Sequence, residues 1–331
     1  MNLNFTIKKV RQLERISINS LKNYCVEGKY RDLVEPSFAE LSLLFQLYKS
    51  SFQAPIPTLL LPSTVSEVQR KVFFNLYSSS RFPEISTLRG VESWNICPYC
   101  GLRNSVTLDH YLPRRLEDFP HFSQFLLNLI PACGDCQQKK GAYSPSQVAR
   151  RKFWYKRRNG NGGLRRIFAA CKKQTRRWTR IGNCNRIIHP YLDFDFDFQR
   201  IELNFDFNSI VGPYNFRLSY KSRSRSLQHQ LFVFHSAKLA LNERLTDPLR
   251  KEWATFERYL RALGHNAGST PEKIRESILA LGERSYEKLG EFSMERKFVT
   301  AIANRHECID YLKQLVSRAP VNVLKKKGRR P

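Results

Sequence analysis

The sequence lacks any apolar run close to the roughly 20 residues that a membrane-spanning helix needs. Its opening residues, from Met1 to Val10, also lack the apolar region of a secretory signal. These two absences predict a cytoplasmic protein that has no membrane partner, in which reduced thiols are the default state. The eight cysteines are too few and too clustered for a disulfide scaffold.

Acidic residues are also scarce. The chain has 29 Asp and Glu against 56 Lys and Arg, which gives a formal net charge of +27. Self-repulsion of that size opposes compaction unless a polyanion is present. Nucleic acid is the commonest such partner, and an anionic membrane surface is the competitor. Hydrophobic residues at 41% and aromatic residues at 12% still predict a folded protein.

The positive charge is concentrated in one stretch of the chain. No acid occurs from Gln137 through Leu192, and 14 Lys or Arg fall between Arg150 and Arg186. Solvated helix faces usually alternate in sign, so an unrelieved positive run favours phosphate contact. We therefore predict a nucleic-acid-binding segment over residues 146–190. The candidate phosphate contacts in it are Arg150, Arg151, Lys152, Lys156, Arg157, Arg158, Arg165 and Arg166.

Two Cys-x-x-Cys pairs, at Cys97 and Cys100 and at Cys133 and Cys136, are separated by 32 residues. This spacing lets both sulfurs of a pair face one ion, and two pairs close a tetrahedral zinc site. A redox dithiol needs only one pair, in a βαβ context that does not fit here. The sequence therefore predicts a structural Zn²⁺ ion with no open coordination position.

The insert between the cysteine pairs contains an adjacent acid and imidazole, Asp109 and His110. The β-prone residues 105–108 lead into this pair and place it at the end of a predicted strand. Hydrolysis of a phosphodiester needs an activated water and a cation over the developing charge. An imidazole and a carboxylate can divide these two tasks, so the insert is a candidate hydrolytic centre.

These motifs together resemble the HNH (ββα-metal) endonucleases, including bacterial HNH proteins of anti-phage defence loci. The resemblance rests on Cys-Pro-Tyr-Cys, Leu-Asp-His and Asn-Leu-Ile-Pro-Ala-Cys. It implies that Asp109 ligates a catalytic Mg²⁺ or Mn²⁺ ion, that His110 is the general base and that Asn128 fixes its imidazole. The remaining ligand of the catalytic cation then falls on Gln137, where the family has His or Asn.

Gln137 is the departure from the family pattern. Its amide oxygen can ligate a hard cation. The extra methylene shifts that oxygen by about one bond length, and such a misplacement can cost about 100-fold in rate. Two hypotheses stay open: a metal-dependent endonuclease acting on DNA rather than RNA, and a zinc-stabilised nucleic-acid-binding protein whose nuclease centre has degenerated. The resemblance to defence-locus proteins also implies an effector that a partner ATPase activates.

Three further basic residues lie close to the predicted centre. Arg114 and Arg115 follow the His and could hold phosphates beside the scissile bond, with solvated surface arginines as the alternative. Lys140 occupies a position where the family commonly has Lys before Gly, and it is a candidate phosphate contact on the same terms. Downstream, Ile188-His-Pro-Tyr resembles a motif of the same proteins and would bring His189 towards the centre, unless it is an ordinary turn.

We expect an α+β fold with a zinc-stabilised ββα-metal (HNH) core, embedded in a mainly helical chain with a small antiparallel β-sheet. The expected segments are a helical region (1–95), the HNH module (96–145), the basic segment (146–190), a β-hairpin or small sheet (191–235) and a helical region with a basic tail (236–331).

Apolar spacing places the individual elements. Helices are predicted over 38–48 and from Ser63 onward, and again over 239–263, 271–290 and 295–315. Alternation of polar and apolar residues predicts strands over 193–198, 201–207 and 215–220.

Overall fold

The computed structural model describes residues 7–27, 31–35, 66–78, 96–102, 106–143, 186–193, 196–223, 226–286 and 293–318, with isolated positions between 38 and 88. The predicted basic segment up to residue 185 and the basic tail lie outside these residues. The chain divides into two compact units. The first comprises Met1–Glu202, Leu218–Asn242 and Lys288–Met294, and the second comprises Leu203–Arg217, Glu243–Glu287 and Glu295–Pro331.

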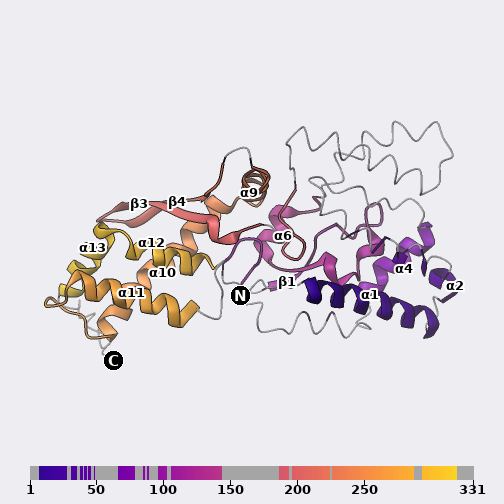
Figure 1. Cartoon of the computed structure of the whole chain (residues 1–331), viewed down its shortest axis with the longest axis horizontal. Coiled ribbons are helices and arrows are strands. Elements are labelled where there is room, and N and C mark those ends of the chain that lie inside the picture. The colour runs from indigo at the N-terminus through magenta and orange to yellow at the C-terminus, as the bar shows by residue number, and fades with distance from the viewer. Residues whose placement is uncertain are drawn as a thin grey trace, which may run out of the picture. The chain divides into compact units, whose positions relative to one another are not determined.

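A small ββα arrangement lies in the first unit (Figure 1). Strand β1 (Val106–His110) pairs antiparallel with β2 (Leu129–Cys133), with Asp109 opposite Ile130. Helix α6 (Gly134–Lys140) begins directly after β2. The predicted strand before Asp109 and the predicted short helix after the second cysteine pair are therefore confirmed.

Helices cover this arrangement within the first unit. Helix α1 (Ile7–Glu27) packs against α2 (Arg31–Val34) and against the 3₁₀ turn Leu126–Asn128, while α4 (Glu67–Ser78) packs against the 3₁₀ turn Pro120–Phe122. The described positions between residues 38 and 48 are helical, as predicted.

The predicted helix start at Ser63 is wrong, because α4 begins at Glu67. A capping box sets this boundary: the Ser66 hydroxyl accepts from the Gln69 amide at 3.2 Å, and the Gln69 side chain accepts from the Ser66 amide at 2.8 Å. Two backbone donors that the helix cannot satisfy are thereby satisfied reciprocally.

Strands β3 (Ile201–Asn208) and β4 (Gly212–Tyr220) form the predicted β-hairpin. Gly212 begins β4 with φ +74°, and a Cβ there would lie 2.6 Å from the Trp253 indole nitrogen. The strand predicted over 193–198 is wrong for the residues described. Asp197 instead caps a 3₁₀ turn, Phe198–Arg200, by accepting from the Gln199 amide at 3.0 Å.

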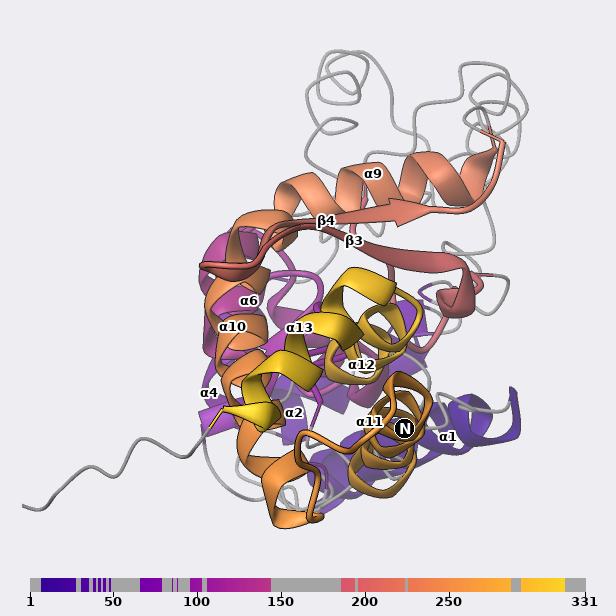
Figure 2. The same cartoon turned by 90° about the vertical axis from the view of Figure 1, so that its left-hand side faces the viewer.

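Helices make up most of the remaining described chain: α9 (Leu227–Lys238), α10 (Leu241–Ala262), α11 (Pro271–Tyr286), α12 (Met294–Ala303) and α13 (His306–Ser317). In the second unit, α10–α13 lie on one side of the hairpin (Figure 2). Phe298 packs there against Phe205 and Phe216, with ring centroids 5.7 and 5.6 Å apart.

Two of the C-terminal predictions need correction. The helix predicted over 295–315 is interrupted at Asn304 and Arg305, which separate α12 from α13. Helix α9 was not predicted and overlaps the residues expected to form a sheet. Its apolar side chains are spread around the helix, so they give little helical periodicity, although its Ser226 cap, which accepts from the His229 amide at 3.1 Å, follows the usual pattern.

Candidate functional site

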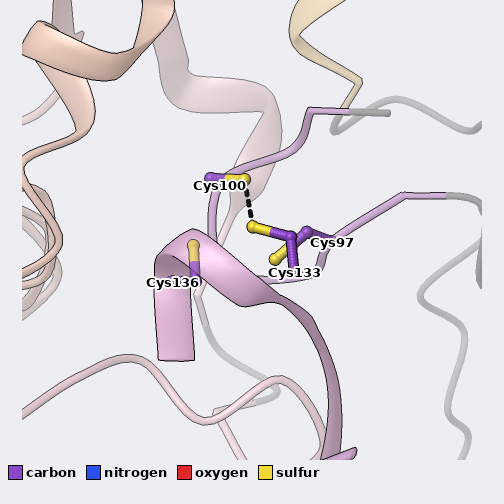
Figure 3. Close-up of side chains that lie close together, drawn as sticks. All are labelled: Cys97, Cys100, Cys133 and Cys136. Carbon is purple, nitrogen blue, oxygen red and sulfur yellow. Dashed lines mark hydrogen bonds between the residues drawn. The ribbon is translucent and has the colours of Figure 1, made fainter. Parts of the chain in front are cut away.

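The four paired cysteines converge in the first unit (Figure 3). Their sulfur atoms all lie within 4.8 Å of one another and all four residues are buried, with the Cys100 and Cys133 sulfurs 3.9 Å apart. A tetrahedral zinc ion with Zn–S distances of about 2.3 Å requires sulfurs about 3.8 Å apart. The donor set therefore fits a structural zinc ion, as the spacing predicts.

The first cysteine pair lies in a turn, and the second lies where β2 ends and α6 begins. In the first pair, the Gly101 amide donates to the Cys97 carbonyl at 2.8 Å, and Gly101 has φ +71°, where glycine is favoured. In the second pair, Cys133 ends β2 and Cys136 lies in the first turn of α6. An ion held by all four would tie the strand pair and α6 to the first turn. Among the described residues, no other group of three or more His, Cys, Asp or Glu could share an ion.

His110 is the last residue of β1, and its Nε2 lies 2.9 Å from the Ser123 carbonyl oxygen. A carbonyl only accepts, so the neutral ring carries its proton on Nε2 and Nδ1 is the basic nitrogen. Burial, with smaller contributions from the positive charges of Arg114 and Lys140, lowers the pKa of His110 to about 3, and the hydrogen bond to Ser123 opposes this shift. The imidazole is therefore neutral at pH 7, which is the form that can accept a proton.

Asp109 precedes His110 on β1, and its carboxylate lies among buried partners. The Tyr99 hydroxyl donates to Oδ2 at 3.1 Å, and the Lys140 ammonium lies 3.1 Å from Oδ2 and 3.2 Å from Oδ1. Burial raises the pKa of Asp109, while the Lys140 charge opposes that rise. Both oxygens of the predicted metal ligand are thus engaged by a cation that belongs to the chain.

Lys140 does not lie where a phosphate could reach it. Its side chain is only 2% exposed, and its ammonium also donates to the His110 carbonyl at 2.7 Å. A buried ammonium needs a paired charge and hydrogen bonds to offset its lost hydration, and Asp109 and the carbonyl supply them. The prediction of a phosphate contact at Lys140 is corrected accordingly.

Asn128 lies beneath the loop that follows β1. Its Oδ1 accepts from the Leu112 amide at 2.8 Å and from the Tyr48 hydroxyl at 2.9 Å, and its Nδ2 donates to the Leu112 and Phe122 carbonyls, each at 3.1 Å. These four bonds use the full capacity of a carboxamide. Asn128 therefore fixes the loop backbone and not the imidazole, which corrects the role taken from the resemblance. The Ser123 carbonyl holds the ring instead.

His189 is fully buried and is linked to Asn128 through the Tyr48 hydroxyl. Its Nδ1 accepts from the Tyr191 amide at 3.2 Å, so its proton lies on Nε2, 3.2 Å from the Tyr48 hydroxyl. The hydroxyl in turn donates to Asn128, which gives a directed chain of hydrogen bonds from His189 to the loop. The sequence left open whether His189 approaches the centre or lies in an ordinary turn, and it gave no signal for Tyr48, which is distant in the chain.

Gln137 is partly buried in the first turn of α6, and its amide nitrogen donates to the Thr107 hydroxyl on β1. Thr107 and Asp109 share one face of β1, because alternate residues of a strand point to the same side. The Gln137 amide nevertheless bonds to Thr107 while Lys140 neutralises Asp109. The carboxylate of Asp109 is thus already paired with a cation of the chain, and the nitrogen of the Gln137 amide is held by Thr107.

The two arginines after His110 have different surroundings. The Arg114 guanidinium lies over the Phe74 and Tyr77 rings, at 4.6 and 4.8 Å from their centroids. Arg115 pairs with Asp118 at 2.7 Å, and its side chain is 55% exposed. Arg115 is thus the more exposed of the two, and a phosphate contact at either residue stays a prediction. The other candidate contacts, from Arg150 to Arg166, lie outside the described residues.

His235 on α9 joins the first cysteine turn to the His-Pro-Tyr segment, and sequence reasoning missed it. Its Nε2 lies 2.6 Å from the Tyr99 carbonyl oxygen, and its Nδ1 accepts from the Ile188 amide at 3.1 Å. Burial lowers the pKa of His235 to about 4. The unfolded chain, with a pKa of about 6.5, binds this proton more readily. The stability that His235 contributes is therefore complete above pH 6.5 and lost as the pH falls towards 4.

We predict that His235→Gln removes this pH dependence, since Gln offers a donor and an acceptor but does not titrate. Between pH 6 and pH 4.5, the unfolding free energy of the wild type should fall more steeply than that of the variant, by about 1.4 kcal/mol per pH unit. Urea unfolding of both proteins at a series of pH values measures the difference. Any acid release of zinc affects both proteins alike. Equal slopes would contradict the assignment.

Comparison with known proteins gives limited information. No protein-family model matches the chain, and no solved structure matches it. The chain is similar to Protein ea31 of Escherichia phage lambda, at 30% identity over 107 residues, which is 31% of this chain and 36% of that protein. The match thus spans about a third of each. No helix within the described ranges is long and apolar enough to span a membrane. What the structure establishes is a mostly helical chain with two small antiparallel sheets and a buried four-cysteine cluster that can hold zinc.

Proposed function

We propose that residues 96–143 form the catalytic module of an endonuclease that hydrolyses phosphodiester bonds, with His110 as the general base. One observation carries this proposal. A neutral imidazole at the end of β1 is held through Nε2 by the Ser123 carbonyl, in a strand pair whose other end carries Cys133 of the cluster that fits a structural zinc ion. A general base must be unprotonated at the working pH, and the neutral His110 meets this condition, while the bond to Ser123 fixes its ring.

In the proposed reaction, His110 Nδ1 takes a proton from the water whose oxygen bonds to the phosphorus. The P–O bond to the leaving sugar oxygen breaks, and that oxygen takes a proton from solvent. The resulting imidazolium donates through Nε2 to the Ser123 carbonyl, which keeps the ring in place as the charge forms. Asn128 and Tyr48 hold the loop that carries this carbonyl, because Asn128 bonds to Leu112 and to Phe122, which directly precedes Ser123. The zinc ion would hold β2 and α6 against the first cysteine turn.

The divalent cation that the HNH resemblance implies does not fit the donor set as found, because the Lys140 ammonium engages both oxygens of Asp109. We therefore route no step through it, and a requirement for Mg²⁺ or Mn²⁺ stays a prediction. A nucleic-acid substrate is supported by the net charge of +27. The preference for DNA over RNA, a role in anti-phage defence and a partner ATPase rest on the resemblance alone.

The test is to incubate the purified full-length protein with supercoiled plasmid, tRNA and single-stranded DNA, each with Mg²⁺, Mn²⁺ or EDTA. Nicking or cleavage of plasmid that EDTA abolishes would support the proposal, including its cation requirement. Cleavage that persists in EDTA would support the hydrolase and reject the cation. Preferential cleavage of tRNA would replace DNA by RNA as the substrate. No cleavage of any substrate would reject the proposal.

A second candidate function is nucleic-acid binding by a zinc-stabilised module whose nuclease centre has degenerated. The ion pair of Asp109 with Lys140 favours it, because the carboxylate of the predicted metal ligand is neutralised within the module. In this case the protein binds the same substrates with salt-dependent affinity but leaves them intact.

Replacing Gln137 by His or Asn distinguishes the two functions. If the centre is degenerate, we expect the His or Asn variant to gain about 100-fold or more in cleavage rate, because the ligand is restored to the family position. If Gln137 takes part in catalysis, both variants lose activity. The matched control is Gln138→Asn at the exposed neighbouring position, which should change neither binding nor cleavage.

A further inference from the structure

The guanidinium of Arg114 has no acid partner among the residues that the structure describes. Its Nη1 atom is buried and has no hydrogen-bond partner. The neighbouring cations differ, because Arg115 pairs with Asp118 at 2.7 Å and Lys140 pairs with Asp109 at 3.1 Å. An unpaired buried donor is costly, and in a native protein it calls for a functional explanation. Arg114 is therefore the guanidinium that stays available to an external anion.

Arg114 and His110 lie against the same aromatic ring of α4. The guanidinium carbon of Arg114 is 4.8 Å from the Tyr77 ring centroid, and the His110 ring centroid is 4.5 Å from it. The positive charge of Arg114 also contributes to the low pKa of His110, which agrees with this proximity. A phosphate hydrogen-bonded to a guanidinium, together with its attacking water and the base, spans roughly 8–10 Å. One phosphate can therefore bridge the two side chains.

The backbone and the side chain of Arg114 are both held in place. Arg114 follows Pro113, whose carbonyl accepts from the Phe119 amide at 3.1 Å, so the loop is closed around it. Its guanidinium lies over the Phe74 ring as well as the Tyr77 ring, at 4.6 Å from the Phe74 centroid. Contact with two aromatic faces favours a cation in this position. A charge fixed in advance costs little reorganisation when the reaction occurs.

We infer that Arg114 is a catalytic residue, whose guanidinium binds the scissile phosphate and stabilises the negative charge that develops on its oxygens. A guanidinium fork fits two phosphate oxygens, and such a clamp stabilises phosphoryl transfer. The resemblance gives this task to a divalent cation at Asp109, but Lys140 already neutralises that carboxylate. The inference rests on the proposed function for the reaction itself, and it makes that cation dispensable. Arg114 keeps its protons throughout, while His110 takes the proton of the water.

The first test compares plasmid cleavage by the zinc-loaded full-length protein and its variants in EDTA. Arg114→Met keeps an apolar stem on the two rings but loses the charge, so kcat should fall at least about 100-fold while KM changes little. Arg114→Lys keeps the charge without the fork and should lose about tenfold. Arg250→Met, the same change at an exposed arginine of α10, should cleave like the wild type. Full activity of Arg114→Met, or wild-type cleavage that EDTA abolishes while zinc stays bound, would overturn the inference.

The second test uses the wild type and does not depend on a variant that folds. Modification by phenylglyoxal followed by mass spectrometry reports how available each guanidinium is. Arg114 should react in the free protein and should be protected by saturating duplex DNA in EDTA. Equal reactivity with and without the duplex would overturn the inference.

The outcomes separate this inference from the proposed function. If His110→Ala is inactive while Arg114→Met keeps full activity, the inference alone fails. If the wild type cleaves no substrate under any condition, the proposed function and the catalytic role of Arg114 fail together.

Discussion

Replacing His110 by alanine is expected to lower the rate of phosphodiester cleavage by about 10²–10⁴-fold, which is the usual contribution of a general base. The variant removes Nδ1, the basic nitrogen of a ring whose other nitrogen is committed to the Ser123 carbonyl. Nucleic-acid affinity should stay within about twofold of the wild type, because a neutral imidazole contributes no charge to phosphate binding. The measurements are plasmid nicking and fluorescence anisotropy on the same preparations.

Two controls separate a loss of chemistry from a loss of structure. The His110 ring contacts Tyr77 at a centroid distance of 4.5 Å, so its removal costs packing as well as one hydrogen bond. Zinc content and the urea midpoint of the variant must therefore be measured beside its activity. His306→Ala changes an exposed histidine on α13 and should leave cleavage intact. If His110→Ala retains full activity with one zinc per chain, His110 is not the base.

The local elements of the module could be predicted from sequence because their signals are short-range. Two Cys-x-x-Cys pairs predict a four-sulfur cluster, and the structure brings these sulfurs together. The β-prone residues before Asp109 form β1, and the residues after Cys133 form α6. Each of these patterns depends on residues only a few positions apart, so it predicts its local element without knowledge of the tertiary fold.

The partners of the site residues could not be predicted, because they come from distant parts of the chain. Tyr48 reaches Asn128 across 80 positions, and His235 reaches the Tyr99 carbonyl across 136. No periodicity or motif encodes such pairings. They decide the role of each residue: the loop bonds of Asn128 and the burial of Lys140 both differ from what the motif implies.

Loss of zinc is expected to unfold the module around the site. Cys133 ends β2 opposite Val106 of β1, and Cys136 follows in α6, so a shared ion joins both strands and the helix to the first cysteine turn. Structural zinc contributes about 10–16 kcal/mol in small zinc-binding peptides, which is as large as the total stability of most domains. Cys133→Ser should therefore reduce zinc from one per chain to near zero, as measured by elemental analysis.

The consequences of Cys133→Ser should be confined to the first unit. Hydrogen exchange should show lost protection at β1 and β2, while α10–α13 keep theirs, because those helices have their own aromatic core around Phe256 and Phe298 and supply no ligand to the cluster. Cys308→Ala, which truncates a buried cysteine of α13, is the matched control and should retain one zinc. Full protection of β1 and β2 in zinc-free protein would mean that packing alone forms the strand pair, and the cluster would then have no structural role.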